Sequence, residues 1–230
     1  SRVTNRLHGR VTRLYLTPLI RSLQQVAGSH PLLTFLDSFR YPLAGEFAMV
    51  RDLAWINRVP GDWGLEVGVL SEIYRNCALR RICQADIADA YEHKHQSLSA
   101  DNAEQGLQKM CVDITKSLFR NLASEGVVLS EAVLKTLRAT YLQTAQEAIT
   151  RYQNDAAINS LQFDRHEERM AVEVFLKGMK IATEAFLDDP LGVPMISNWS
   201  RVTGAIPDIF ERLIGAVERD HEWDPVGDRV

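Results

Sequence analysis

The sequence lacks the features that mark several common functional classes. Its 230 residues carry a formal net charge of −4, so there is no basic excess to neutralise a nucleic-acid backbone. No apolar run approaches the roughly 20 residues that a membrane span requires, and no signal-peptide pattern is visible. We therefore expect a cytoplasmic protein with neither a nucleic-acid partner nor a membrane contact.

Cysteine is also scarce, and the three cysteines do not pair by number or by spacing. Cys77, Cys83 and Cys111 form no C-x-x-C motif of the kind that binds zinc. Their neighbours are largely apolar, which favours reduced thiols buried in a hydrophobic core. We expect neither a disulfide nor a cysteine metal site.

What is present is the composition of a globular protein, with 46% hydrophobic and 24% charged residues. A chain of this length can bury a sizeable core. Residues 1–99 mix turn residues with short apolar segments, whereas residues 100–230 carry long stretches of helical periodicity. We therefore expect two parts that divide near residue 99.

Apolar spacing predicts the elements of each part. In the second part, the predicted helices cover residues 107–122, 130–152, 165–187 and 207–222. In the first part, the predicted elements are helices over residues 4–27, 32–39, 47–56 and 62–77, and a strand over residues 81–87. Pro18 should break the first helix, because the residue before a proline avoids helical angles. Asp62 is a candidate N-cap, followed by an apolar face that runs from Trp63 to Cys77.

One short motif in the first part suggests an anion site. In Gly9-Arg10-Val11-Thr12, the glycine would let a ligand approach the backbone, and both Arg10 and Thr12 can donate a hydrogen bond to a phosphate. Arginines also recur at positions 2, 6, 10 and 13, which is typical of a solvated helical face. The sequence leaves both interpretations open.

Other polar residues have equally plain alternatives. Glu66 falls in the first turn of a predicted helix, where the helix dipole favours a carboxylate whether or not it takes part in chemistry. Gly45 suits a turn at positive φ. His93 and His95 would point the same way from an extended loop, but two histidines alone are a weak metal signal.

Four motifs in order carry a resemblance: Gly9-Arg10-Val11-Thr12, Pro42-Leu43-Ala44-Gly45-Glu46, Trp63-Gly64-Leu65-Glu66 and His93-Lys94-His95-Gln96. Together they resemble the acceptor-binding half of the GT-A glycosyltransferases that make glucosyl-3-phosphoglycerate or mannosylglycerate. The resemblance implies an α/β fold with predominantly helical content. Residues 1–99 would be the acceptor- and metal-site half of a GT-A-like catalytic domain, and residues 100–230 a helical C-terminal subdomain.

The same resemblance implies an activity. A retaining hexosyltransferase would use UDP-glucose or GDP-mannose to modify 3-phosphoglycerate or glycerate, and so make a compatible solute. The acceptor-binding residues would be Arg10, Thr12, Leu43, Gly45, Trp63 and Lys94. Glu66 would be the catalytic residue that positions the reacting groups. His95 would complete a site for a divalent metal, Mg²⁺ or Mn²⁺, which neutralises charge on the leaving diphosphate.

The sequence also departs from that family. Trp63 stands where we expect a tyrosine in some members, and His93 where we expect an asparagine, so the identity of the acceptor stays open. The Asp-x-Asp metal motif of the nucleotide-binding segment is absent, and we expect that segment to precede Ser1 in a longer protein. This chain alone would then be an incomplete and inactive part of an enzyme.

Two further hypotheses remain at this stage. Apolar faces on several predicted helices favour a homodimer, because such faces need a partner surface. A different class of function, a non-catalytic helical interaction module without a complete active site, explains the same helices and treats the polar loops as incidental.

Overall fold

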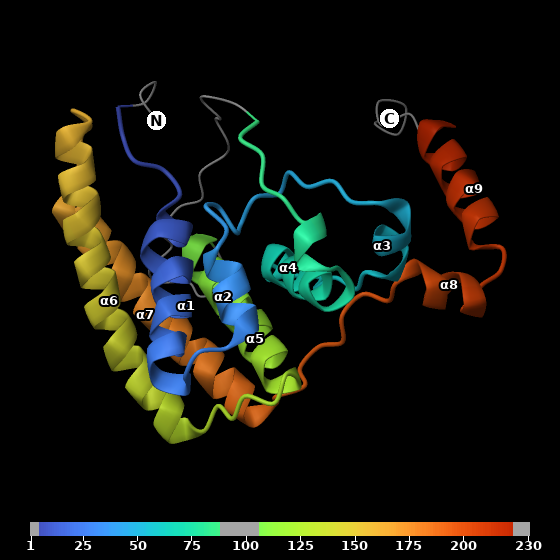
Figure 1. Cartoon of the computed structure of the whole chain (residues 1–230). Coiled ribbons are helices and arrows are strands. Elements are labelled where there is room, and N and C mark those ends of the chain that lie inside the picture. The colour runs from blue at the N-terminus through green and yellow to red at the C-terminus, as the bar shows by residue number, and fades with distance from the viewer. Residues whose placement is uncertain (1–4, 88–105, 223–230) are drawn as a thin grey trace, which may run out of the picture.

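The computed structural model describes residues 5–87 and 106–222, and within these ranges the chain is almost entirely helical (Figure 1). The elements are η1 (Thr12–Leu16), α1 (Thr17–Ala27), α2 (Pro31–Asp37), α3 (Arg51–Ile56), α4 (Leu65–Asn76), η2 (Leu79–Arg81), α5 (Gly106–Ser124), α6 (Glu131–Ile158), α7 (Arg165–Asp188), α8 (Trp199–Ala205) and α9 (Ile209–Glu222). The predominantly helical content is confirmed. The described ranges show no α/β half of a GT-A domain, since strand-like pairing in them is limited to two isolated bridges.

Three long helices, α5, α6 and α7, form the body of the molecule, and α1 packs along α6 (Figure 1). Two of these helices, α6 and α7, begin with a side-chain cap. The Ser130 hydroxyl accepts a hydrogen bond from the Val133 amide at 3.4 Å, and the Asp164 carboxylate accepts from the His166 amide at 2.8 Å. The four helices predicted in the second part are confirmed as α5, α6, α7 and α9.

The centre of the core is a group of three fully buried aromatic rings. The Tyr15 ring lies 5.6 Å from that of Tyr141 and 5.3 Å from that of Phe175, as measured between centroids. Each tyrosine hydroxyl has a partner, which a buried polar group requires. Tyr15 shares a hydrogen bond with the Thr115 hydroxyl, and Tyr141 donates to the carbonyl of Leu14 at 2.9 Å. Helices η1, α6 and α7 therefore meet at one apolar centre.

The predicted helix break before Pro18 is wrong, since the backbone stays helical from Arg10 to Ala27. The turn before the proline is widened to a π-helix, in which the Thr17 amide donates to the Thr12 carbonyl. Pro18 has no amide hydrogen for the Leu14 carbonyl, and the Tyr141 hydroxyl donates to that carbonyl instead. The hydrogen bond from Tyr141 in α6 thus stabilises a helical segment that the local effect of Pro18 alone would end.

The predicted strand over residues 81–87 is also wrong. The chain forms the short turn η2 and then runs irregularly to Ile87, whose side chain is exposed. Gln84 ties this segment to the end of α2 through its side chain: its Oε1 accepts from the Arg40 amide at 2.7 Å, and its Nε2 donates to the Ser38 carbonyl at 3.3 Å. Within the described ranges no neighbouring strand lies beside residues 81–87, so their backbone cannot form the hydrogen bonds of a sheet.

The start and the apolar face of α4 differ in part from the prediction. The N-cap is Gly64, and Asp62 accepts a hydrogen bond from its amide at 2.9 Å from outside the helix. Val67 is fully buried as predicted, but Trp63 is 41% exposed, because it precedes the helix and points away from the core. Of the three cysteines, all free thiols, Cys111 is buried as predicted, Cys77 is half-buried and Cys83 is exposed.

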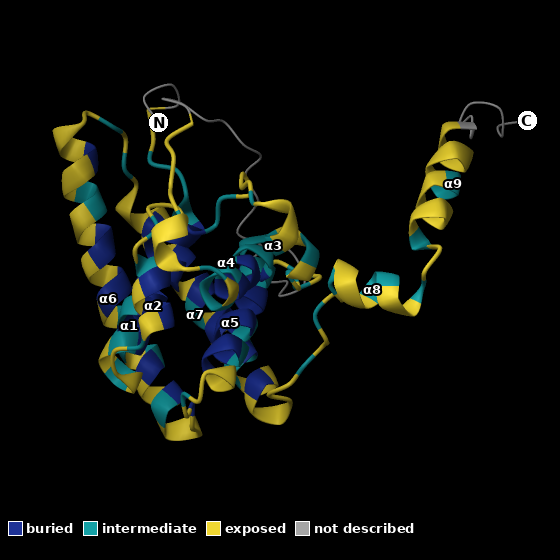
Figure 2. Ribbon diagram, turned by 45° about the vertical axis from the view of Figure 1, so that its right-hand side comes forward, coloured by how far each residue is buried: buried dark blue, intermediate teal, exposed yellow. Residues whose placement is uncertain are grey.

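The hydrophobic core continues across the predicted boundary at residue 99, since α1 and α4 pack on α6 and α5 respectively. The division into two parts stays a prediction. Beyond α7, α8 and α9 extend away from the body, and α3 lies against α8 (Figure 2). Trp55, Trp199 and Phe210 form one aromatic cluster, in which the ring centroid of Trp55 lies 6.1 Å from that of Trp199 and 5.8 Å from that of Phe210, and those of Trp199 and Phe210 lie 5.4 Å apart. No described helix is long and apolar enough to cross a membrane.

Candidate functional site

The first sequence motif and the residue just before the second motif meet where the first helix begins. Gly9 has a φ of +70°, which favours glycine, and the Arg13 amide donates to its carbonyl at 2.9 Å. A Cβ atom at Gly9 would lie 3.0 Å from Cε2 of Tyr41, so the second motif's segment lies directly against this turn. A side chain at position 9 would suffer both the backbone strain and that contact.

Tyr41 also responds to a residue of the third motif, Glu66. Burial raises the pKa of its hydroxyl, the charges of Glu66 and Glu46 raise it further, and the Thr12 hydroxyl opposes the rise. The Thr12 hydroxyl is buried and makes no hydrogen bond of good geometry, although it lies near enough to Tyr41 to act on it. Tyr41 therefore lies against the start of the first helix and within electrostatic reach of Glu66. Sequence reasoning placed it beside a motif but gave it no role.

Glu66 lies in the first turn of α4, and its environment favours the neutral acid. Burial raises the pKa of its carboxyl, and a hydrogen bond from its own backbone amide opposes the rise. The glycines of the same motif set the helix close to its neighbours. A Cβ at Gly64 would lie 2.6 Å from Cβ of Ser117 in α5, and a Cβ at Gly68 would collide with the Pro60 ring.

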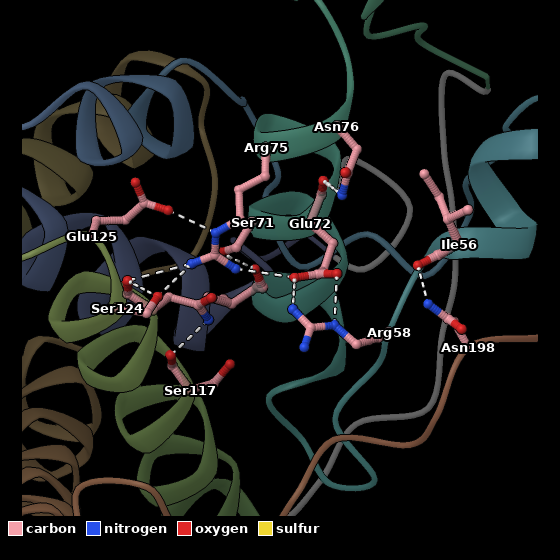
Figure 3. Close-up of polar contacts among 12 residues, drawn as sticks. Ile56, Arg58, Ser71, Glu72, Arg75, Asn76, Ser117, Ser124, Glu125 and Asn198 are labelled. Carbon is pink, nitrogen blue, oxygen red and sulfur yellow. Dashed lines mark hydrogen bonds and ion pairs between the residues drawn. The ribbon is translucent and has the colours of Figure 1, made fainter. Parts of the chain in front are cut away.

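An ion-pair cluster around the buried Glu72 carboxylate fixes α4 and the turn before it (Figure 3). The Glu72 carboxylate accepts hydrogen bonds from Arg58 Nε and Nη2, at 3.3 Å and 3.1 Å, and from Arg75 Nη1 at 3.1 Å. Arg75 also donates to Glu125 at 2.6 Å, beyond the end of α5. Asn198 reaches the same region and donates to the Ile56 carbonyl at 3.0 Å. Helix α4, which carries Glu66, is thus bound both to the turn before it, through Arg58, and to the end of α5, through Glu125.

Arg10 points the other way, toward the start of α7. Its Nε donates to Glu168 Oε1 at 3.1 Å, and its Nη2 donates to Glu167 Oε2 at 3.2 Å. A polar hollow of about 490 Å³ lies here, between the Arg10 turn and the first turn of α7. Its lining residues are Arg6, Leu7, Arg10, Gln162, Phe163, Asp164, Arg165, His166, Glu167 and Glu168. The structure therefore does not bring the side chains of Arg10 and Thr12 to one common partner, although their backbones share one helical turn.

The other predicted site residues have varied surroundings. Leu43 packs partly against the core, whereas Trp63 is exposed. Gly45 is exposed as well, with a φ outside the positive range, and a Cβ there would meet no atom within 4 Å, so the expected positive φ is wrong. Lys94 and His95 lie outside the described residues.

No group of three or more histidine, cysteine, aspartate or glutamate side chains suited to a metal ion occurs within residues 5–87 and 106–222. These residues alone therefore do not fit a divalent metal site. A second, more apolar hollow of about 570 Å³ lies between α2 and the segment after α4, and Phe35, Tyr74 and Cys83 are among its lining residues. No pattern in the sequence indicates this hollow.

Comparison with known proteins supports the resemblance. The chain is 51% identical over 224 residues to the glucosyl-3-phosphoglycerate synthase of Persephonella marina, which covers 97% of this chain and 55% of that protein. The chain is related to the glucosyl-3-phosphoglycerate synthases. It is also 42% identical over 215 residues to the protein of that name from Methanococcoides burtonii, covering 93% of this chain and 52% of that one. The chain thus spans about half the length of the relatives it matches. No protein-family model and no solved structure matches it.

Glu66 should make the free energy of unfolding depend on pH. Because burial raises its pKa in the folded state, the folded protein binds a proton more tightly than the unfolded chain does. Stability is therefore lost as pH rises from the ordinary glutamate pKa, about 4.3, through the raised value. Glu66→Gln should match the wild type near pH 4 and be the more stable protein near pH 7, as measured by urea unfolding at both. A difference that does not change with pH, or that grows toward acid, would contradict this.

Proposed function

We propose that this chain is the acceptor-binding, C-terminal part of a retaining glycosyltransferase that moves a hexose from a nucleotide sugar to 3-phosphoglycerate or glycerate. The observation that carries the proposal is the close approach of Tyr41 to Gly9 at the start of the first helix, where the Thr12 hydroxyl and the charge of Glu66 both act on the Tyr41 hydroxyl. A helical interaction module would have no need of this polar cluster. The similarity to two proteins named glucosyl-3-phosphoglycerate synthase supports 3-phosphoglycerate as the acceptor.

The start of the first helix has the chemistry to bind a phosphate. The first amides of a helix have no acceptor within the helix, and the helix dipole places partial positive charge there. Gly9 holds its backbone at positive φ beside Tyr41, the Thr12 hydroxyl is buried without a good partner, and Arg10 carries a positive charge on the same turn, where Glu167 and Glu168 pair with it. These groups suit the phosphate of 3-phosphoglycerate.

Glu66 would then hold the acceptor hydroxyl in position for transfer, in line with its closeness to Tyr41. The nucleotide sugar, UDP-glucose or GDP-mannose, would bind to a further part of a longer protein, and this chain by itself would be inactive. A divalent metal would need His95 together with ligands beyond the described residues. We derive no reaction step through it.

Titration calorimetry tests the proposal. The chain should bind 3-phosphoglycerate with saturable heat, and glycerate, which lacks the phosphate, at least about tenfold more weakly, the factor for one charge-assisted hydrogen bond. Equal affinities for the two ligands would contradict a phosphate site. No measurable binding of 3-phosphoglycerate would contradict the proposal and favour the interaction module.

We also propose that α9 mediates a homodimer. Phe210, Leu213, Ile214 and Val217 recur at helical spacing on one face, and each is between 42% and 60% exposed. Ile214→Asp would place a charge in that face and should shift the mass measured by light scattering from dimer to monomer, while Lys180→Asp on α7, where Lys180 is exposed, should not. A wild-type chain that is monomeric at high micromolar concentration would rule the dimer out.

A further inference from the structure

We infer that Glu168 is a positioning residue for the acceptor phosphate, because it holds the Arg10 guanidinium beside the helix start where that phosphate would bind. This inference rests on the proposed function. Glu168 lies more than 150 residues from Arg10 in sequence, in the first turn of α7, and no motif in the sequence marks it.

The geometry is that of one buried carboxylate shared by two arginines. Glu168 is 5% exposed; its Oε1 accepts from Nε of Arg10 at 3.1 Å, and its Oε2 accepts from Nη2 of Arg13 at 3.2 Å. Arg13 is itself fixed, because its Nε donates to the His8 carbonyl at 2.8 Å and its guanidinium lies 4.8 Å from the centre of the Tyr152 ring. Glu168 is therefore a rigid anchor, and Arg10 is the more exposed of its two partners.

This arrangement fixes the Arg10 guanidinium through two carboxylates, the buried one of Glu168 and the exposed one of Glu167. Two guanidiniums share one buried carboxylate, and a buried carboxylate is stable only when it is paired in this way. Nη1 of Arg10 has no hydrogen-bond partner among the residues that the structure describes, and Arg10 lines the polar hollow. Without Glu168, the flexible arginine would have no fixed direction, and binding a phosphate would then cost its rotamer freedom.

The neighbouring Glu167 pairs with the same guanidinium but differs in exposure. Its side chain is 55% exposed, compared with 7% for Glu168, and it contacts Arg10 at 3.2 Å through Nη2. An exposed carboxylate is easily replaced by an incoming phosphate, because little free energy is lost when it returns to water. Two adjacent glutamates should therefore have different effects on phosphate binding, which provides a matched control.

The test measures the affinity of the whole chain for 3-phosphoglycerate and for glycerate by calorimetry. Glu168→Gln should weaken 3-phosphoglycerate binding by ~5- to 30-fold and leave glycerate binding unchanged. Glu168→Asp keeps the charge and should restore part of the loss. Glu167→Gln should bind 3-phosphoglycerate as tightly as the wild type, or more tightly. Circular dichroism checks that each variant is folded. If Glu168→Gln is not folded, the affinity of Glu168→Asp for 3-phosphoglycerate is compared with that of the wild type instead.

A double-mutant cycle separates positioning from general stability. If Glu168 acts through Arg10, Glu168→Gln should cost no further affinity when Arg10 is already alanine. Normal 3-phosphoglycerate binding by Glu168→Gln, equal losses from Glu167→Gln and Glu168→Gln, or additive losses in the cycle would each overturn the inference and leave the proposed function standing. A wild-type chain that binds no 3-phosphoglycerate would overturn the proposed function and this inference with it.

Discussion

Replacing Phe175 by alanine should lower the free energy of unfolding by about 3–5 kcal/mol, the range for removing a fully buried aromatic side chain. Phe175 is 0% exposed and lies against the Tyr15 ring at 5.3 Å between centroids. The rigid helices around it, η1, α6 and α7, leave little room for the cavity to collapse. Urea unfolding, with the slope held common to both proteins, measures the difference.

The matched control is Phe47→Ala, which makes the same chemical change at a residue that is 52% exposed. That variant should stay within about 0.5 kcal/mol of the wild type, as most surface substitutions do. A loss at Phe175 no larger than the loss at Phe47 would mean that α7 does not pack on the first helix as described.

Replacing Arg10 by alanine should weaken 3-phosphoglycerate binding by about 1.5–3 kcal/mol, which is roughly 10- to 150-fold. The reason is the loss of one charge-assisted hydrogen bond at the start of the first helix. In a longer protein that also binds the nucleotide sugar, affinity for that donor should change little. Calorimetric titration with each ligand distinguishes the two effects.

Arg21→Ala is the control for removing one positive charge. Arg21 lies on α1 and pairs with Asp37 at 3.1 Å, away from the start of the first helix. The Arg21→Ala variant should bind 3-phosphoglycerate with the affinity of the wild type. An equal loss from both substitutions would show that the phosphate responds only to the overall charge, and an equal loss of donor and acceptor affinity at Arg10 would show that this arginine is not an acceptor residue.

Sequence periodicity predicted the long helices well, because α5, α6 and α7 bury one continuous apolar stripe and have clear capping residues such as Ser130 and Asp164. It failed where distant contacts override local rules. The chain passes Pro18 without a break because a π turn widens the helix and Tyr141 bonds the carbonyl that the proline leaves free. The segment after η2 alternates like a strand but has no partner in the described ranges. Periodicity also missed α8, in which no residue is buried.

The site was predictable only in part. Short motifs pointed to Gly9, Thr12 and Glu66, but nothing in their spacing showed that Tyr41 lies against Gly9 or that Thr12 and Glu66 both act on Tyr41, because these relations depend on tertiary packing. Glu168 was invisible for the same reason: in sequence it is one of several acidic residues at a helix start. Buried partners of charged residues are a property of the fold, and local patterns do not encode them.

Amide chemical shifts of the ¹⁵N-labelled chain, recorded as 3-phosphoglycerate is added, test the central claim most directly. The account predicts that the largest changes fall on Gly9 to Thr12, Tyr41 and Glu66, with smaller changes at Glu167 and Glu168 at the start of α7. Glycerate at the same concentration should produce much smaller changes at Gly9 to Thr12. Changes confined to the apolar hollow around Phe35 and Tyr74, or no changes at all, would contradict the account.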